Sequence, residues 1–192
     1  MRNLVLPLVL VGLPAVAGSQ TIREQVLSGV SEEVVIADYP TPSLRGLIAS
    51  AGAVVQVTVR NSDSFVSSDG SIVTDYRIAV VDVIKESPGS RINTGDVITI
   101  RRIGGVVNIE GRRVFSNEGG FPPFASGSEY VLFLKTDAGQ PFEMLAGPQS
   151  AFLVHQGAAA SLAASAKGPL TIPMPALLSE VKEVSSRPNG TR

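Results

Sequence analysis

The sequence predicts a mainly β protein, an antiparallel barrel or sandwich of five or six strands with a short helix before the first strand and a helix at the C-terminus. Short segments of alternating apolar and polar residues recur from residue 53 to residue 154, and turns rich in Gly, Asp and Pro separate them. Apolar stripes at helical spacing flank this region on both sides. This order, without strand–helix–strand alternation, is typical of antiparallel β folds and disfavours a doubly wound nucleotide-binding fold.

The first 17 residues, MRNLVLPLVLVGLPAVA, have the layout of a secretory signal peptide. One positive charge precedes an apolar stretch, and small residues at Ala15 and Ala17 form an A-x-A cleavage site. A membrane anchor is the alternative, but a spanning helix needs roughly 20 continuous apolar residues, and Pro7 and Pro14 interrupt this stretch. We predict residues 1–17 to be a cleaved signal peptide, the protein to be secreted or periplasmic, and the mature chain to have no stable membrane span.

The next segments are a lead and the first helix. Residues 18–42 are predicted to be an N-terminal lead that is partly flexible. Ile22, Val26 and Val30 recur at four-residue spacing, which leaves a short, weak helix as the alternative, but Gly29 disfavours it. Residues 43–51, SLRGLIASA, follow with Ser43 as the N-cap and apolar residues at helical spacing, which predicts a short helix.

Five segments then have strand character. Residues 53–60 alternate Val with polar residues, and Asp69-Gly70 marks a polar hairpin turn before a second strand. Further strands are predicted at 96–102, at the dense apolar run 128–135, and within 142–155. A long glycine-rich excursion lies between Gly104 and Gly127, and loops of this length tend to hold short strands of their own or a functional surface. The second strand, 74–86, places Tyr76, Ile78, Val80 and Asp82 on one face if its alternation is regular.

The predicted domain organisation places the β domain at residues 43–156. Residues 157–174, rich in Ala, Ser and Gly, are predicted to be a flexible linker. Residues 175–186 carry a stripe of Leu177, Val181 and Val184, which predicts a closing helix, and residues 187–192 are predicted to be a disordered tail.

Four segments, taken together, resemble netrin-like domains, a class that includes the tissue inhibitors of metalloproteinases and domains of exported bacterial proteins. The matching segments are Ala53–Val59, Tyr76–Lys85, Val97–Ile100 and Phe124–Phe133, and the resemblance covers roughly residues 43–154. It implies an OB-type barrel. Netrin-like inhibitors depend on disulfides and on an N-terminal cysteine that chelates the protease zinc. This chain has no cysteine, so the resemblance implies the fold but no inhibitory mechanism.

The composition argues against a nucleic-acid partner and indicates a packed core. The chain has 192 residues with 16 basic and 17 acidic side chains, and no basic cluster exceeds two adjacent residues. Nucleic-acid binders usually concentrate basic charge on one face, so we predict no nucleic-acid partner. The 44% hydrophobic content suffices for a packed core, which must stabilise the fold without disulfides.

Motifs for catalysis, metals and cofactors are absent from the sequence. His155 is the single histidine, there is no H-E-x-x-H or G-x-S-x-G, and the glycines match no phosphate-binding loop. We therefore predict no catalytic residue, no metal site, no cofactor and no enzymatic activity.

Paired carboxylates are the remaining route to catalysis. Asp75, Asp82 and Glu129 lie at strand starts or turns, where acidic residues are commonly solvated. Asp82 lies either at a strand end that emerges from the barrel or in an ion pair with Arg101 or Arg102, and the sequence favours such a pair over a catalytic role.

The favoured function is an exported, non-catalytic binding or interaction module of the cell envelope or exterior. The sequence does not identify its partner, for which a protein is the candidate. The alternatives are a hydrolase with carboxylates at the barrel mouth and a structural subunit of an envelope assembly. Phe121 and Phe124, which flank Pro122-Pro123, form either a cap on an open barrel end or a binding platform. The possible interaction surface comprises Phe121, Phe124, Arg112, Arg113 and Phe115.

Overall fold

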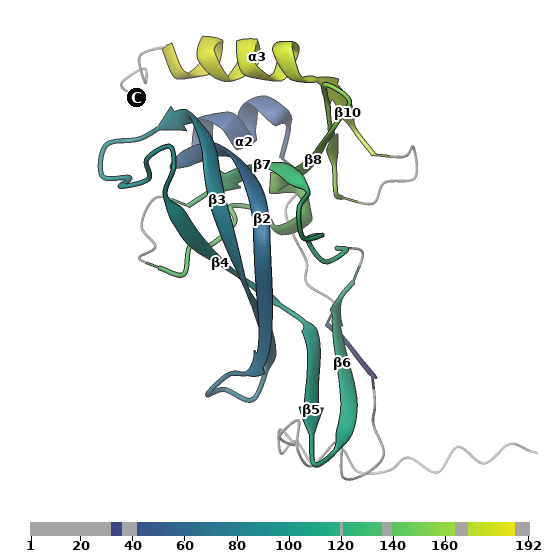
Figure 1. Ribbon diagram of the computed structural model, residues 1–192. Helices are drawn as coiled ribbons and strands as arrows, with labels where there is room; N and C mark the ends of the chain where they lie inside the picture. The colour runs from purple at the N-terminus through teal and green to yellow at the C-terminus, as the bar shows by residue number, and fades with distance from the viewer. Residues whose placement is uncertain (1–31, 36–41, 120, 136–139, 164–168, 187–192) are drawn as a thin grey trace, which may run out of the picture.

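Figure 1 shows the computed structural model of the chain, which describes residues 32–35, 42–119, 121–135, 140–163 and 169–186. The described residues form a seven-stranded antiparallel sheet, a three-stranded sheet and two α-helices, and this confirms the predicted mainly β class. The predicted signal peptide, most of the predicted lead and the predicted tail lie outside the described residues.

The large sheet has the strand order β10-β9-β8-β7-β2-β3-β4. Its neighbouring strands are all antiparallel. The small sheet has the order β1-β6-β5, in which β1 runs parallel to β6. The strands are β1 (Glu32–Val35), β2 (Ala53–Val66), β3 (Ile72–Glu86), β4 (Val97–Ile103), β5 (Gly105–Ile109), β6 (Arg112–Glu118), β7 (Glu129–Leu134), β8 (Ala151–His155), β9 (Ala158–Ser161) and β10 (Thr171–Pro173).

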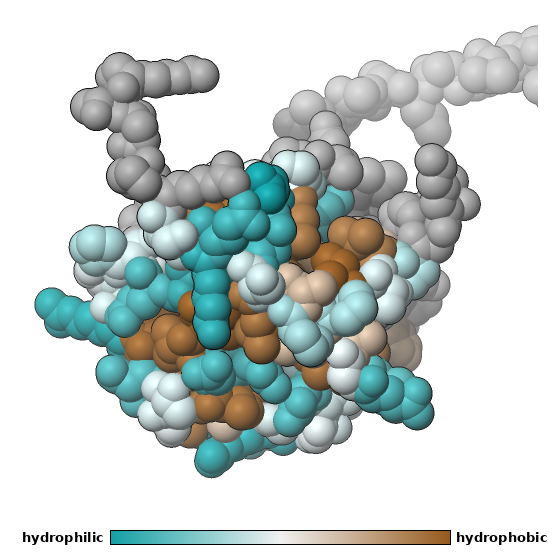
Figure 2. All heavy atoms as spheres, turned by 90° about the horizontal axis from the view of Figure 1, so that it is seen from above, coloured by the Kyte–Doolittle hydropathy of each residue, from teal (hydrophilic) through white to brown (hydrophobic). Residues whose placement is uncertain are grey.

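Helices α2 (Leu44–Ser50) and α3 (Met174–Ser186) lie together at one end of the molecule (Figure 1). The predicted N-cap is confirmed, because Ser43 Oγ accepts a hydrogen bond from the Gly46 amide at 3.1 Å. Arg45 Nε of α2 donates to Glu180 Oε1 of α3 at 2.5 Å, and this ion pair raises the pKa of Arg45. Seen from above, this end of the molecule exposes both hydrophobic and hydrophilic residues (Figure 2).

Strand β7 separates two cores, as its apolar side chains on both faces predict. Tyr130, Leu132 and Leu134 pack in a first core with the inward faces of β2, β3 and β4. Val131 and Phe133 pack in a second core with α2 and α3, and β7 lies between β2 and β8. The prediction that residues 128–135 form a central strand with these two faces is confirmed.

The glycine-rich excursion from 104 to 127 contains the β5–β6 hairpin. This hairpin and the far end of the β2–β3 hairpin project away from the helices (Figure 1). A small third core joins them, in which Ile72 of β3 contacts Val107 and Val114.

Two predictions about strands need revision. A bulge in β3 makes Asp82 the Cα partner of Gln56 while Val80 pairs with Val57, so Val81 and Asp82 together oppose one residue. The extra residue breaks the alternation, Asp82 is exposed, and its predicted place on the face of Val80 is wrong. Strands β9 and β10 lie within the predicted linker, 157–174, and extend the edge of the large sheet, β9 with the small side chains of its sequence AAAS.

The sheet as paired does not close into a barrel. Among the described strands, β10 and β4 lie at the two edges. Single bridges involve the segment after β7, with Phe142 beside Ile100 of β4 and Met144 beside Leu134 of β7. Neither α2 nor α3 is long and apolar enough to cross a membrane, and no other described helix is.

We predict that Leu132→Ala will lower the free energy of unfolding by about 2–5 kcal/mol, because truncation of a buried leucine leaves a cavity. Leu132 is 1% exposed in the first core. Chemical denaturation measures the loss, and Val66→Ala, at a side chain that is 40% exposed, is the control, expected to change stability by less than about 0.5 kcal/mol. An equally small change for Leu132→Ala would contradict the core assignment.

Candidate functional site

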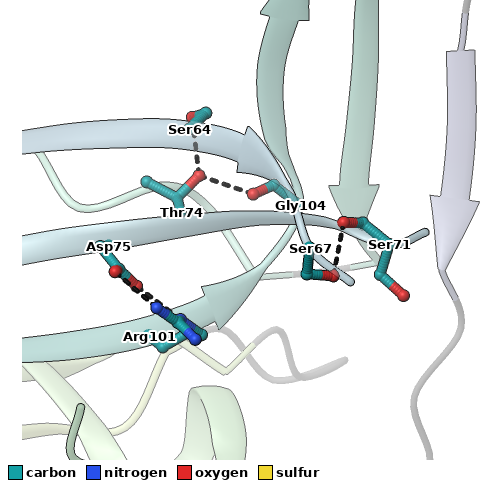
Figure 3. Close-up of polar contacts among 7 residues, drawn as sticks. All are labelled: Ser64, Ser67, Ser71, Thr74, Asp75, Arg101 and Gly104. Atoms are coloured by element: carbon teal, nitrogen blue, oxygen red, sulfur yellow. Dashed lines mark hydrogen bonds and ion pairs between the residues drawn. The ribbon is translucent and has the colours of Figure 1, made fainter. Parts of the chain in front are cut away.

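The site is built where β4 passes into β5. Thr74 Oγ1 donates to the Gly104 carbonyl oxygen at 2.6 Å and accepts from Ser64 Oγ at 2.8 Å (Figure 3). Gly105 has φ +143°, and a Cβ there would lie 2.3 Å from Thr74 Oγ1. Only glycine fits this crossing, which aims the β5–β6 hairpin away from the large sheet.

Beside this crossing, Arg101 points to the outer face of the sheet. Its Nε and Nη2 donate to the two carboxylate oxygens of Asp75, each at 2.7 Å (Figure 3). This bidentate pair raises the pKa of Arg101. The guanidinium also lies over the Phe65 ring, 5.1 Å from its centroid.

Arg102 points the other way and is buried, with 5% of the residue exposed. Its Nη2 donates to Glu118 Oε2 at 3.3 Å and to the Phe121 carbonyl oxygen at 3.0 Å. Its Nη1 donates to the Pro122 carbonyl oxygen at 2.8 Å. A buried guanidinium is tolerated only when it is paired and hydrogen-bonded, and these acceptors supply that environment at its two terminal nitrogens.

Three aromatic rings complete the surroundings of Arg102. Its guanidinium carbon lies 3.3 Å from the ring centroid of Phe121, 4.8 Å from that of Phe124 and 5.9 Å from that of Tyr76. The two phenylalanines meet edge to face at 5.9 Å, and Phe124 meets Tyr76 at 5.0 Å. Burial raises the pKa of Tyr76, and the positive charge of Arg102 opposes this shift.

A cavity of about 320 Å³ opens against this cluster, and we call it the apolar cavity. Three side chains exposed at its rim are apolar, with exposed fractions of 40% for Ile103, 40% for Val106 and 43% for Phe115. Val106 and Phe115 are cross-strand partners in the β5–β6 hairpin, and Arg113 lies 4.8 Å from the Phe115 ring centroid. The other lining residues include Tyr76, Arg102, Glu118, Phe121 and Pro123.

A second hollow of about 480 Å³ lies beside the first, and we call it the edge groove. It shares Arg102, Ile103 and Glu118 with the apolar cavity. Its remaining lining residues are Val73, Arg101, Lys135, Pro141, Glu143, Met144 and Gly147. Lys135 Nζ donates to Glu143 Oε2 at 2.6 Å, so this pair neutralises the charge at the rim.

The structure places the predicted interaction residues in three environments. Phe121 and Phe124 are buried in the first core, which fits the capping interpretation and not an exposed platform. Phe115 and Arg113 are exposed and stack at the rim of the apolar cavity. Arg112 is exposed but shares the hairpin face of Val114, two residues later, so it lies on the face away from Phe115.

The predicted carboxylates do not form a shared cluster. Asp75 is paired with Arg101, Glu129 accepts from Gln56 Nε2 at 3.5 Å, and Asp82 is exposed. The predicted pairing of Asp82 with Arg101 or Arg102 is wrong, because those arginines pair with Asp75 and Glu118. His155 is exposed at the end of β8. Within the described ranges, no group of three or more His, Asp or Glu side chains could hold a metal ion.

Sequence reasoning missed the Arg102–Glu118 pair. A signal was present, because Arg102 follows Ile98 and Ile100 at the strand period and therefore shares their inward face. The partner could not be found this way, because the path of the chain from β6 back to β4 determines it.

Neither a family model nor a curated protein matches the chain.

We predict that Glu118→Gln will lower the free energy of unfolding by about 3 kcal/mol, because it leaves the buried Arg102 charge without its carboxylate. The matched control is Glu86→Gln at an exposed position of β3, where we expect a change below about 0.5 kcal/mol. Urea unfolding monitored by circular dichroism measures both. If the two variants unfold alike, the pair does not stabilise the fold.

Proposed function

We propose that the chain is an exported, non-catalytic binding module that holds an apolar side chain of a protein partner in the apolar cavity. The observation that carries this proposal is the rim of exposed Ile103, Val106 and Phe115 around a hollow with a fixed floor. Scattered exposed apolar residues are ordinary, but a contiguous group around a cavity is typical of a binding surface.

The floor supports binding because it is held in place before any partner arrives. Arg102 is bound by a carboxylate and two carbonyl oxygens, and Phe121 stacks on its guanidinium. A preorganised pocket spares the partner much of the entropic cost of ordering it. A volume of about 320 Å³ admits an aliphatic or aromatic side chain but not a folded segment.

The rim favours a protein partner over a small polar metabolite. Phe115 presents an exposed aromatic ring with Arg113 stacked on it, and aromatic and arginine side chains are enriched in the centres of protein interfaces. A residue such as Leu or Phe on the partner would bury apolar area against Ile103 and Val106 at about 25 cal/mol per Å².

For the architecture we propose an OB-type barrel related to netrin-like domains. The bridges made by Phe142 with β4 and by Met144 with β7 support this proposal, because they bring the chain between the two strands that a closed barrel would join. The resemblance of residues 43–154 in sequence supports it independently.

Export is proposed from residues 1–17. We predict that N-terminal sequencing of the protein recovered from the periplasm or the medium will start near Gly18, because the A-x-A site precedes it. Recovery of the protein with intact Met1 in the cytosol would contradict export.

We predict that Phe115→Ser will abolish partner capture without loss of stability, because it removes the largest apolar side chain of the rim and Phe115 is already exposed. The measurement is a pull-down of the tagged mature protein from its native envelope fraction, with quantification of each co-purified protein.

The matched control is Val81→Ser, at a side chain that is 42% exposed and does not line the apolar cavity. A true partner is retained by the parent and by Val81→Ser and is lost at least about tenfold by Phe115→Ser, as removal of an interface anchor implies. Equal capture by all three proteins would refute binding at the apolar cavity.

A further inference from the structure

The outer edge of β4 carries hydrogen-bonding groups that β3 does not use. The Gly104 amide donates to the Ile72 carbonyl oxygen at 2.8 Å, which fixes the phase of this antiparallel pair. In such a ladder alternate residues exchange bonds with the partner strand, and the others point their N–H and C=O groups away from it. Thr99, Arg101 and Ile103 are therefore the residues of β4 that point outward.

The chain itself demonstrates that this edge accepts an extended segment. The Phe142 amide donates to the Thr99 carbonyl oxygen at 2.8 Å, and the Arg101 amide donates to the Phe142 carbonyl oxygen at 3.4 Å. Phe142 therefore occupies the outer edge beside Ile100. If the same parallel pairing continued, Met144 would bond to the Arg101 carbonyl and the Ile103 amide.

Met144 instead follows β7. The Lys135 amide donates to the Glu143 carbonyl oxygen at 3.0 Å, and the Leu145 amide donates to the Phe133 carbonyl oxygen at 2.9 Å. Because Glu143 and Leu145 use their groups toward β7, the N–H and C=O of Met144 point to the opposite side, toward β4. The segment that contains Phe142 and Met144 thus leaves β4 after Phe142. The outer edge of β4 and the main-chain groups of Met144 then face each other without being paired.

The edge groove lies between the edge of β4 and the segment around Met144. Its lining includes Arg101 and Ile103 from β4 and Glu143 and Met144 from the opposite side. Val73 and Ile103 are cross-strand partners that make one wall apolar, and the Arg102–Glu118 pair lies at the inner end. The three ion pairs around it, Arg101–Asp75, Arg102–Glu118 and Lys135–Glu143, leave no net charge that would select a charged ligand.

We propose that the edge groove receives an extended segment of a partner protein, which adds as a strand between β4 and Met144 and closes the barrel. The main chain of that segment bonds to the Arg101 carbonyl and the Ile103 amide on one side and to Met144 on the other. Its apolar side chains pack on Val73 and Ile103, and small polar ones face the Arg102–Glu118 pair. The inference rests on the proposed function only in taking the partner to be a protein, and it supplies the mode of binding.

The test uses the wild-type protein and a blocked peptide of about seven residues that alternates Val and Thr, since main-chain bonds supply most of the affinity in strand addition. Amide hydrogen exchange is followed by NMR in the ¹⁵N-labelled protein. We expect the Ile103 and Met144 amides to exchange at least about tenfold more slowly once the peptide is in tenfold excess over its Kd. The Val97 amide, which points outward from the same edge but does not line the groove, is expected to be unchanged.

Two comparisons make the result decisive. The same peptide N-methylated at alternate residues keeps its side chains but loses its donors, and we expect it to give no protection. Ile103→Pro removes the amide hydrogen to which the added strand bonds. Val97→Pro makes the same change at the other end of the β4 edge. We expect only Ile103→Pro to abolish binding of the peptide. The proposal would be overturned if the Ile103 amide were already protected from hydrogen exchange in the free protein, or if the peptide at about 1 mM gave no protection of this amide.

The outcome separates this inference from the proposed function. Phe115→Ser lies outside the edge groove and is expected to leave peptide protection at Ile103 intact. Protection without any effect of Phe115→Ser on partner capture would refute the apolar cavity alone. Loss of capture by Phe115→Ser with no protection by the peptide would refute strand addition alone.

Discussion

The structure around the candidate site depends on one buried cation, Arg102. Its guanidinium joins β4, which carries it, to one segment that follows 16 to 20 residues later, where it binds the Glu118 carboxylate and the carbonyl oxygens of Phe121 and Pro122. Pro122 and Pro123 have no amide hydrogens to add to a ladder. Arg102 holds this stretch through the carbonyl oxygens of Phe121 and Pro122, and the stacked rings of Phe121 and Phe124 close the end of the first core.

The two hollows follow from the same arrangement. The apolar cavity and the edge groove share Arg102, Ile103 and Glu118 as their common wall. Because the ion pair must keep its own geometry to remain satisfied, the side chains around it cannot collapse freely onto one another. The glycine crossing at Gly104 and Gly105 adds the second constraint, since it turns β5 and β6 away and leaves the cavity open on the side of Phe115.

The sequence predicted those features that local chemistry determines. The cap at Ser43, the closing helix and the two faces of β7 were all readable, because each depends on a short periodic pattern. The orientation of Asp82 could not be predicted, because a β-bulge depends on how two strands pair and the sequence of one strand alone does not indicate it. The length of the glycine-rich excursion indicated short strands or a functional surface within it, but it did not give the bounds of β5 and β6, because Gly104 and Gly105 serve the crossing from β4 and not a loop. The candidate site was predicted in part: Phe115 and Arg113 belong to it, while Glu118 reaches Arg102 through the fold alone.

The two edges of the large sheet are protected to different extents, and this difference explains why the edge groove could bind a strand. Exposed strand edges invite pairing with other chains, and proteins usually blunt them with short strands, prolines or a covering segment. At one end of the large sheet, β10 is three residues long and ends at Pro173. At the other end, Phe142 covers β4 at Ile100, but the cover stops there and turns to β7. The part of the β4 edge that lies beside the edge groove is flanked by Val73, Ile103 and Met144. Retaining an uncovered, apolar-walled edge carries a risk of aggregation, and a partner strand that fills it would remove that risk and gain the unused main-chain bonds.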